Sequence, residues 1–206
     1  MYELEHQLWN EGITRVMGLD EVGRGCLAGP VVAAGVILDP CESIDGINDS
    51  KQLSADERVR IAGLIKQKAS YWTIRECTVS EIDEINIYWA SVAAMEKCIY
   101  DCEEWPEYLL VDGKQYPQIP VPGSCVIKGD TKSASIAAAS ILAKVYRDEL
   151  MHHLHEQLPY YGWNSNVGYP TQKHYEGLQQ YGATLYHRRS FKLKTTKEFD
   201  GRAKQH

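Results

Sequence analysis

The chain has 206 residues, of which 44% are hydrophobic and 24% are charged, so it is long enough to bury the core of one large domain. Its first twelve residues are polar and acidic, and no apolar run exceeds the length of one strand, which excludes a secretion signal and a membrane span. The net charge of −6 argues against a protein that binds nucleic acid through a generally basic surface. We therefore expect a cytoplasmic protein that does not associate with a membrane.

The average charge conceals a basic C-terminal end. Residues 173–206 contain eight Lys or Arg and only three acidic residues, whereas the rest of the chain is strongly acidic. Such an end is either a solvated tail or an arm that contacts phosphate. An acidic protein that acts on phosphate would need metal ions as well as a basic arm.

Two apolar strands, residues 15–19 and 31–38, are predicted near the N-terminus, and the segment Asp20-Glu21-Val22-Gly23-Arg24-Gly25 follows the first. The linker is too short for a crossover helix, which favours an antiparallel hairpin. Both strands are apolar at nearly every position, which predicts a sheet covered on both faces. Adjacent carboxylates repel each other unless a cation lies beside them, and glycines let backbone approach a ligand closely. The segment suggests a metal site beside an anionic substrate. The structural alternative is that Asp20 and Glu21 only end a strand and begin a solvated turn.

The middle of the chain reads as helix, strand and helix. Ser54 and Glu57 form a capping box that begins a helix running to Lys68. Residues 71–79 alternate as a strand does, and residues 80–102 carry apolar side chains at helical spacing, which we interpret as core.

Two further short strands, residues 108–111 and 125–127, each end at a carboxylate beside a glycine, in Asp112-Gly113 and in Lys128-Gly129-Asp130. A long helix over 133–157, rich in alanine, then lies close against the sheet. Ligands of open α/β sheets bind beyond the carboxyl ends of the parallel strands. We therefore expect Asp20, Asp112 and Asp130 to gather at one edge of the sheet.

Neither cysteine nor histidine indicates a zinc site. The six cysteines form no C-x-x-C pair, and we expect reduced thiols. The histidines at 152, 153 and 155 lie on at least two faces of the long helix. Carboxylates instead suit hard divalent cations, and two such ions around a phosphate hydrolyse phosphodiesters. A glycosidase that uses one acid and one base is the alternative from paired carboxylates alone, and metal dependence would exclude it.

Several short segments of the sequence resemble the ribonuclease HII family, the type 2 ribonucleases H. They appear in family order and extend over roughly residues 15–190: the segment from Asp20 to Gly25, Asp49-Ser50-Lys51-Gln52-Leu53-Ser54, Val111-Asp112-Gly113, Lys128-Gly129-Asp130, the run from Ser135 to Asp148, and Gly168-Tyr169-Pro170-Thr171. The resemblance implies a ribonuclease H-like α/β fold, with a mixed five-stranded sheet flanked by helices and a small C-terminal helical segment. It also implies a catalytic domain over residues 1–190 and a basic tail over 191–206.

The resemblance further implies an endoribonuclease that uses two divalent ions, Mg²⁺ or Mn²⁺. Its substrates would be the RNA strand of RNA–DNA hybrids and duplex DNA that contains a single ribonucleotide, incised on the 5′ side to leave 3′-hydroxyl and 5′-phosphate ends. We expect it to act as a monomer. The catalytic, metal-binding carboxylates of the family fall on Asp20, Glu21, Asp112 and Asp130.

Substrate contacts are also implied by the match. The backbone of Gly23-Arg24-Gly25 would recognise the ribose 2′-hydroxyl, which distinguishes RNA from DNA. Tyr169 would stack on the sugar of the following deoxynucleotide, and Lys51 would contact a phosphate. The segment 187–190, with Arg189 our candidate, would make further phosphate contacts.

Asp148 lies 18 residues after Asp130, about 27 Å along a helix, so the two cannot share a metal ion. We expect Arg147 and Asp148 to form a structural ion pair or a surface element, with Lys144 as a further partner for Asp148.

Two rival proteins share these features. Ribonuclease HIII has the four carboxylates but usually has Gly-Lys-Gly at the turn and an extra N-terminal domain. Arg24, the Tyr169 motif and the short segment of 19 residues before Asp20 disfavour it. A nucleic-acid-binding module without catalytic activity is the other, and the intact carboxylate set argues against it.

Overall fold

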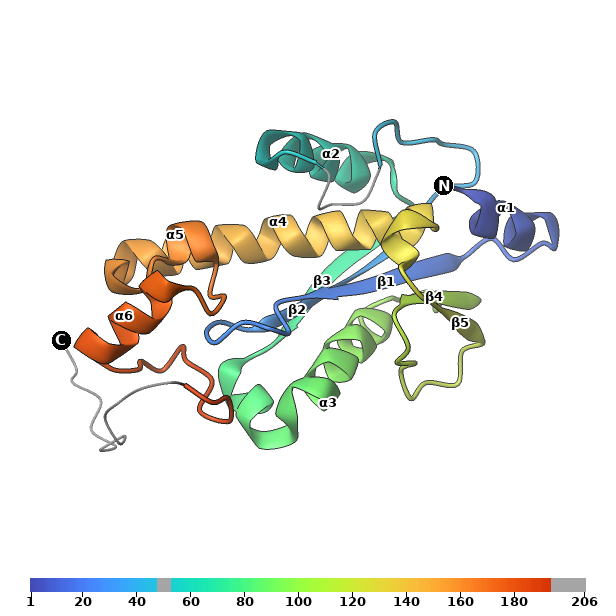
Figure 1. Cartoon of the computed structure of the whole chain (residues 1–206). Coiled ribbons are helices and arrows are strands. Elements are labelled where there is room, and N and C mark those ends of the chain that lie inside the picture. Colours follow the sequence, from blue (N-terminus) through green and yellow to red (C-terminus); the bar gives the residue numbers. More distant parts are fainter. Residues whose placement is uncertain (48–52, 194–206) are drawn as a thin grey trace.

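The chain forms a mixed sheet with helices on both faces in the computed structural model, which describes residues 1–47 and 53–193 (Figure 1). The elements in chain order are α1 (Glu3–Asn10), β1 (Val16–Val22), β2 (Val31–Ile37), α2 (Ala55–Lys68), β3 (Tyr71–Cys77), α3 (Val79–Tyr100), β4 (Tyr108–Asp112), β5 (Gly123–Val126), η1 (Gly129–Thr131), α4 (Ala134–Gln157), η2 (Pro159–Tyr161), α5 (Trp163–Asn166) and α6 (Gln172–Tyr181). The strand order is β3-β2-β1-β4-β5. β1 pairs antiparallel with β2 and parallel with β4, and β5 is parallel to β4. The predicted five-stranded mixed sheet is confirmed.

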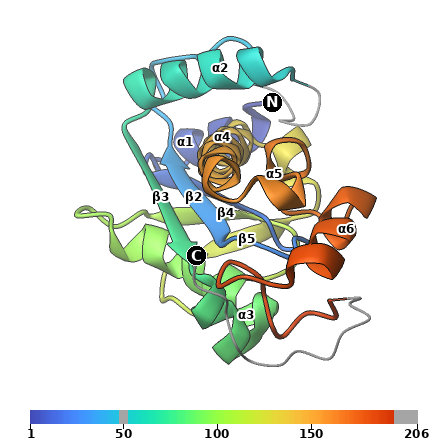
Figure 2. The ribbon, with the colours of Figure 1, turned by 90° about the vertical axis from the view of Figure 1, so that its left-hand side faces the viewer.

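Both faces of the sheet are covered, as the apolar strands predict. Along β2, Val31, Ala33 and Ile37 pack into the core beneath α3, while the alternate residues Val32 and Ala34 pack toward α2 and α4. Figure 2 shows α2 and α4 on one side of the strands and α3 on the other. The hairpin of β1 and β2 therefore forms the centre of the core.

The helix starts follow from capping residues. The hydroxyl of Ser54 accepts a hydrogen bond from the N–H of Glu57, whose carboxylate accepts one from the N–H of Ser54, as the sequence predicts. Thr78 and Glu81 form an equivalent capping box at α3 that the sequence analysis did not identify. Ser133 caps α4 by accepting from the N–H of Ile136 over 3.2 Å.

α4 crosses β1 at very short range. Gly18 in β1 faces the backbone of Ser135, and a Cβ atom at Gly18 would collide with it. The alanines in the first half of α4 are fully buried for the same reason, because only small side chains fit between the helix and the sheet. This contact fixes the start of α4, and with it the preceding turn η1, against the carboxyl ends of β1 and β4.

Two local features differ from the sequence prediction. β1 does not end at Leu19 but runs through both carboxylates, since Asp20 pairs with Ala34 and Glu21 with Ala33 in β2. α1 was not predicted; its apolar side chains pack on Val16 of β1 and on the start of α4. The hydrogen-bonded partner strand, and not the local sequence, determines where β1 ends.

The C-terminal part of the described chain is the small helical segment that the resemblance implies. η2, α5 and α6 enclose their own apolar cluster, which includes Trp163, Leu178 and Met151 of α4. Most of the predicted basic tail lies outside the described residues. In the described ranges no helix is long and apolar enough to cross a membrane. All six cysteines lie within them and are free thiols.

Candidate active site

The predicted carboxylates come to one edge of the sheet. Asp20 and Glu21 lie near the end of β1, Asp112 is the last residue of β4, and Asp130 lies in η1 after β5. These strands are parallel to one another, so their carboxyl ends meet at this edge. The side chains are largely withdrawn from solvent, with Asp20 7% and Asp130 5% exposed.

Asp20 lies in an unfavourable electrostatic environment. Burial raises the pKa of Asp20 well above its usual range, and the negative charges of Glu21 and Asp112 raise it further. A hydrogen bond from Ser140 of α4 lowers the pKa and opposes these effects in part. The ionised form of Asp20 therefore needs a nearby cation to be stable.

Glu21 has such a cation beside it. Its Oε1 accepts a hydrogen bond from Nη1 of Arg24 over 3.2 Å, in an ion pair whose arginine side chain is 41% exposed. Burial raises the pKa of Glu21, and the charge of Arg24 lowers it in part. The guanidinium of Arg24 therefore offsets part of the unfavourable environment of Glu21.

Asp112 is oriented by backbone. Its Oδ1 accepts a 2.7 Å hydrogen bond from the N–H of Gly129, the residue before Asp130. The described residues contain no three His, Cys, Asp or Glu side chains arranged as a formed metal site. The four predicted carboxylates nevertheless fit a hard divalent cation, because their donors are carboxylate oxygens whose mutual repulsion a divalent cation would relieve.

A second group of predicted residues lies on two loops, loop 23–30 and loop 167–171, which contact each other. The N–H of Leu27 donates to the carbonyl of Gly168 over 2.8 Å. A Cβ atom at Gly25 would lie 3.7 Å from Cε1 of Tyr169, so the ring lies against Gly25 although the two residues are 144 positions apart in the sequence. The Tyr169 side chain is 40% exposed and is available to a ligand.

The residues predicted to contact phosphates differ in their surroundings. Lys51 lies outside the described residues. Arg189 is exposed, and its backbone N–H and that of Ser190 donate to the carboxylate of Asp83 over 3.0 and 2.9 Å. The side chains of His187 and Arg188 are 1% and 0% exposed, so the phosphate contact expected from segment 187–190 stays a prediction for the exposed Arg189 and Ser190.

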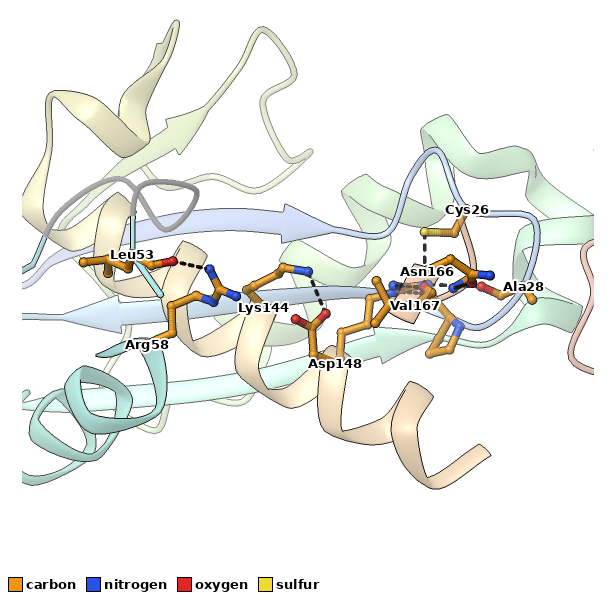
Figure 3. Close-up of polar contacts among 11 residues, drawn as sticks. Cys26, Ala28, Leu53, Arg58, Lys144, Asp148, Asn166 and Val167 are labelled. Carbon is orange, nitrogen blue, oxygen red and sulfur yellow. Dashed lines mark hydrogen bonds and ion pairs between the residues drawn. The ribbon is translucent and has the colours of Figure 1, made fainter. Parts of the chain in front are cut away.

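The expected ion pair of Arg147 with Asp148 is also wrong. Lys144 Nζ pairs with Asp148 Oδ1 over 2.7 Å, as the i,i+4 spacing predicts (Figure 3). Arg147 points to a different side of α4, is fully buried, and donates only to backbone carbonyls. Successive helix residues lie about 100° apart, so Arg147 and Asp148 do not face each other.

Three further residues position this edge of the sheet: Ser140, Gly129 and Glu5. Ser140 and Gly129 lie in segments that the sequence already singles out, but neither residue type indicates this role, because Ser140 lies within the alanine-rich face of α4 and Gly129 acts through its backbone N–H. Glu5 of α1 is fully buried and accepts hydrogen bonds from Ser133 and Ser135 at the start of α4.

Comparison with known proteins agrees with this arrangement. The family model described as Ribonuclease HII matches residues 17–194 of the chain. The chain is 51% identical over 197 residues to the Ribonuclease HII of Salinibacter ruber, covering 94% of this chain and 98% of the relative. It is 50% identical over 192 residues to that of Ruegeria pomeroyi, covering 93% and 82%. Among solved structures, the ribonuclease H2 from Pyrococcus horikoshii OT3 superimposes with a TM-score of 0.73 at 26% identity, covering 86% of this chain and 94% of that one. The similarity extends over at least 86% of this chain and at least 82% of each of these three proteins.

Proposed function

Because the chain belongs to the ribonuclease HII family of metal-dependent endoribonucleases, which act on RNA–DNA hybrids, we propose that it also incises duplex DNA on the 5′ side of a single ribonucleotide. The observation that carries the proposal is the contact of loop 23–30 with loop 167–171. It sets the backbone of Gly23-Arg24-Gly25 beside the exposed ring of Tyr169. One element can thus recognise a ribose while the other contacts the next nucleotide.

We assign metal binding to Asp20, Glu21, Asp112 and Asp130. When bound, two divalent ions, Mg²⁺ or Mn²⁺, would supply an activated water and stabilise the leaving 3′ oxygen of the scissile phosphodiester. The chain orients the ligands: the Gly129 N–H holds Asp112, and Ser140 holds Asp20. Breaking the bond to the 3′ oxygen leaves a 3′-hydroxyl and a 5′-phosphate.

We assign recognition of the 2′-hydroxyl to the backbone of Gly23-Arg24-Gly25, and of the following deoxynucleotide to Tyr169. Arg24, Arg189 and Lys51 would contact phosphates, and so would the basic tail, residues 191–206, that follows the catalytic domain, residues 1–190. All these groups belong to one chain, so a monomer would suffice for the activity. Of the rivals, the glycosidase is wrong because the family is a nuclease family, and ribonuclease HIII is disfavoured because both the family model and the relatives are Ribonuclease HII.

The test is a cleavage assay with product mapping. The substrates are a duplex DNA with one ribonucleotide, the same duplex without it, and a continuous RNA–DNA hybrid, each with Mg²⁺, with Mn²⁺ or with EDTA. We expect incision immediately 5′ to the ribonucleotide, only with metal, and no cleavage of the all-DNA duplex. Binding without cleavage would show a module that has lost catalysis, and cleavage of the hybrid alone would exclude the single-ribonucleotide substrate.

A further inference from the structure

Arg147 of α4 makes an unusual set of contacts. Its side chain is fully buried, and its guanidinium donates three hydrogen bonds, all to backbone carbonyls. Nε donates to Pro30 over 3.0 Å, Nη2 to Ala28 over 3.0 Å and Nη1 to Val167 over 2.8 Å. In the described part of the chain, no carboxylate lies within ion-pair distance of it. Arg147 is thus a buried cation whose partners are loop backbone.

The three carbonyls belong to two different loops. Ala28 and Pro30 lie in loop 23–30, and Val167 begins loop 167–171. Figure 3 shows Cys26, Ala28 and Val167 close together, on the side of Asp148 away from Arg58. There the thiol of Cys26 also contacts the carbonyl of Val167. The planar fork of a guanidinium is suited to this task, because its donors point in fixed, divergent directions. Arg147 therefore joins the loop that carries Gly23-Arg24-Gly25 to the loop that carries Tyr169.

The backbone at the junction is strained. Val167 has φ 42° and ψ 36°, a left-handed conformation that is rare for a β-branched residue. Such a conformation persists only where surrounding contacts hold it. The Arg147 bond to the Val167 carbonyl is one such contact, and the bond from the Leu27 N–H to Gly168 is another. The strained turn directs the chain into Gly168 and Tyr169.

Loop 23–30 is also fitted around Arg147. Gly23 has φ 96°, and a Cβ atom there would overlap the Arg147 side chain, so the glycine is required both by its conformation and by the arginine behind it. Burying an ion without a counter-ion is costly, and an apolar side chain of similar length would fill the space at less cost. The contacts that only an arginine makes are those to the two loops.

Arg188 offers a natural comparison. It is equally buried and donates three hydrogen bonds to backbone carbonyls, those of Arg24, Gly29 and Pro30. All three lie in loop 23–30. Arg188 therefore holds one loop, whereas Arg147 holds the two together.

Building on the proposed function, we propose that Arg147 is a positioning residue that fixes the spacing between the backbone of Gly23-Arg24-Gly25 and the ring of Tyr169. This spacing determines the preference for a ribonucleotide followed by a deoxynucleotide over a continuous hybrid. A looser connection would still allow a ribose to bind and be cleaved, but Tyr169 would no longer lie at a fixed distance from it.

The experiment compares Arg147→Lys with Arg188→Lys. Each keeps the charge, but a lysine ammonium cannot reach three carbonyls in the arginine geometry. The quantities measured are kcat and KM on the single-ribonucleotide duplex and on the continuous hybrid. We expect Arg147→Lys to lower the ratio of kcat/KM for the first substrate to that for the second by about tenfold, corresponding to 1.4 kcal/mol. Arg188→Lys should lower both values and change the ratio less than about twofold.

Two further variants complete the test. In the double variant Arg147→Lys/Tyr169→Ala, the ratio should equal that of Tyr169→Ala alone, because both changes remove the same interaction. If Arg147→Lys does not fold, Arg147→Met replaces it: an apolar side chain of similar length fills the space but donates to neither loop, and the ratio should again fall. An unchanged ratio in a folded Arg147→Lys, or in Arg147→Met, overturns the role of Arg147. A wild-type protein that cleaves the continuous hybrid but not the single-ribonucleotide duplex overturns the proposed function instead.

Discussion

The backbone N–H of Gly129 donates a 2.7 Å hydrogen bond to Oδ1 of Asp112, and this bond joins the end of β4 to the turn that carries Asp130. Two of the proposed metal ligands are thereby held together by backbone geometry. The same bond makes Asp112→Asn an informative variant, because an amide oxygen still accepts from Gly129 while the negative charge is lost.

We expect Asp112→Asn to fold normally, to bind the hybrid as the wild type does, and to lose cleavage by about 100-fold or more, since removing a ligand should cost at least as much as disturbing its support. Cleavage is measured on a labelled substrate, and binding by fluorescence anisotropy. The exposed Glu103→Gln is the control and should retain full activity. Turnover at the wild-type rate in Asp112→Asn would contradict the assignment of this carboxylate.

Asp20→Asn should stabilise the metal-free protein while abolishing cleavage. Because the folded-state pKa of Asp20 is raised, its contribution to stability is fully present below the unfolded pKa and is lost as pH rises through the folded pKa. The neutral variant avoids this loss. In EDTA at pH 7 its Tm should exceed the wild-type value by about 2–4 °C, the shift that 1 kcal/mol gives in a protein of this size.

The advantage should shrink as the pH is lowered toward 4, where the wild-type carboxyl is protonated. Added Mg²⁺ should raise the Tm of the wild type more than that of Asp20→Asn. A variant that melts below the wild type in EDTA at pH 7 would show that Asp20 is stabilising without metal, contrary to its environment.

Tyr169→Ala should impair cleavage at single ribonucleotides more than cleavage of continuous hybrids. Stacking on an aromatic ring is worth ~1–3 kcal/mol, so a selective loss of about tenfold is expected. Tyr100→Ala, another exposed tyrosine, serves as the control. Equal losses on both substrates would mean that the Tyr169 ring only packs against loop 23–30.

His187 should make the protein sensitive to acid. Its Nδ1 accepts hydrogen bonds from the N–H and hydroxyl of Thr184, and its Nε2 lies 3.1 Å from Nε2 of His174. Since Nδ1 of His174 must donate to the Tyr169 carbonyl, Nε2 of His174 is the acceptor and His187 the donor. Burial, and secondarily the charge of His174, lowers the pKa of His187 to about 3.

Stability from this neutral histidine is therefore present above the unfolded pKa of about 6.5 and declines as pH falls toward 3. Between pH 6 and 4 the free energy of unfolding in urea should fall more steeply in the wild type than in His187→Gln, by up to ~1.4 kcal/mol per pH unit. The exposed His153→Gln should behave as the wild type. Parallel slopes in the wild type and His187→Gln would exclude this histidine as the source.

Glu5→Ala should be strongly destabilising although α1 is short. Oε1 of Glu5 accepts from the N–H of Ser135 over 2.9 Å and from the hydroxyls of Ser133 and Ser135 over 2.5 and 2.6 Å. Removing the carboxylate leaves these donors buried without this acceptor. We expect the free energy of unfolding, measured in urea, to fall by about 2–4 kcal/mol. Glu3 in the same helix is exposed, and Glu3→Ala should lower the free energy of unfolding by less than about 0.5 kcal/mol. Similar losses in both would attribute the effect to α1 as a whole.

The parts of the fold that the sequence predicted are those with local causes. The capping box of Ser54 and Glu57 and the small side chains of α4 act within a few residues, and both appear as expected. The gathering of carboxylates followed from a rule about parallel strands that needs only the strand ends. α1 has one buried residue of its own, Glu5, so its pattern carried little signal.

The features that were missed depend on partners far along the chain. The end of β1 depends on Ala33 and Ala34 in the neighbouring strand. The acceptors of Arg147 in loop 23–30 lie 117 and 119 residues away, and an arginine followed by an aspartate suggests a surface. A buried polar residue is visible only once the segment that satisfies its donors is known.

The hydrogen bonds of Arg188 to loop 23–30 join parts of the chain that are synthesised at different times. Its acceptors Gly29, Arg24 and Pro30 precede it by 159, 164 and 158 residues. At ~5–20 residues per second, the loop leaves the ribosome about 10–30 s before the side chain that holds it. Loop 23–30 is therefore synthesised well before the side chain that fixes its carbonyls, and it can take up its final hydrogen bonds only after Arg188 has been added to the chain.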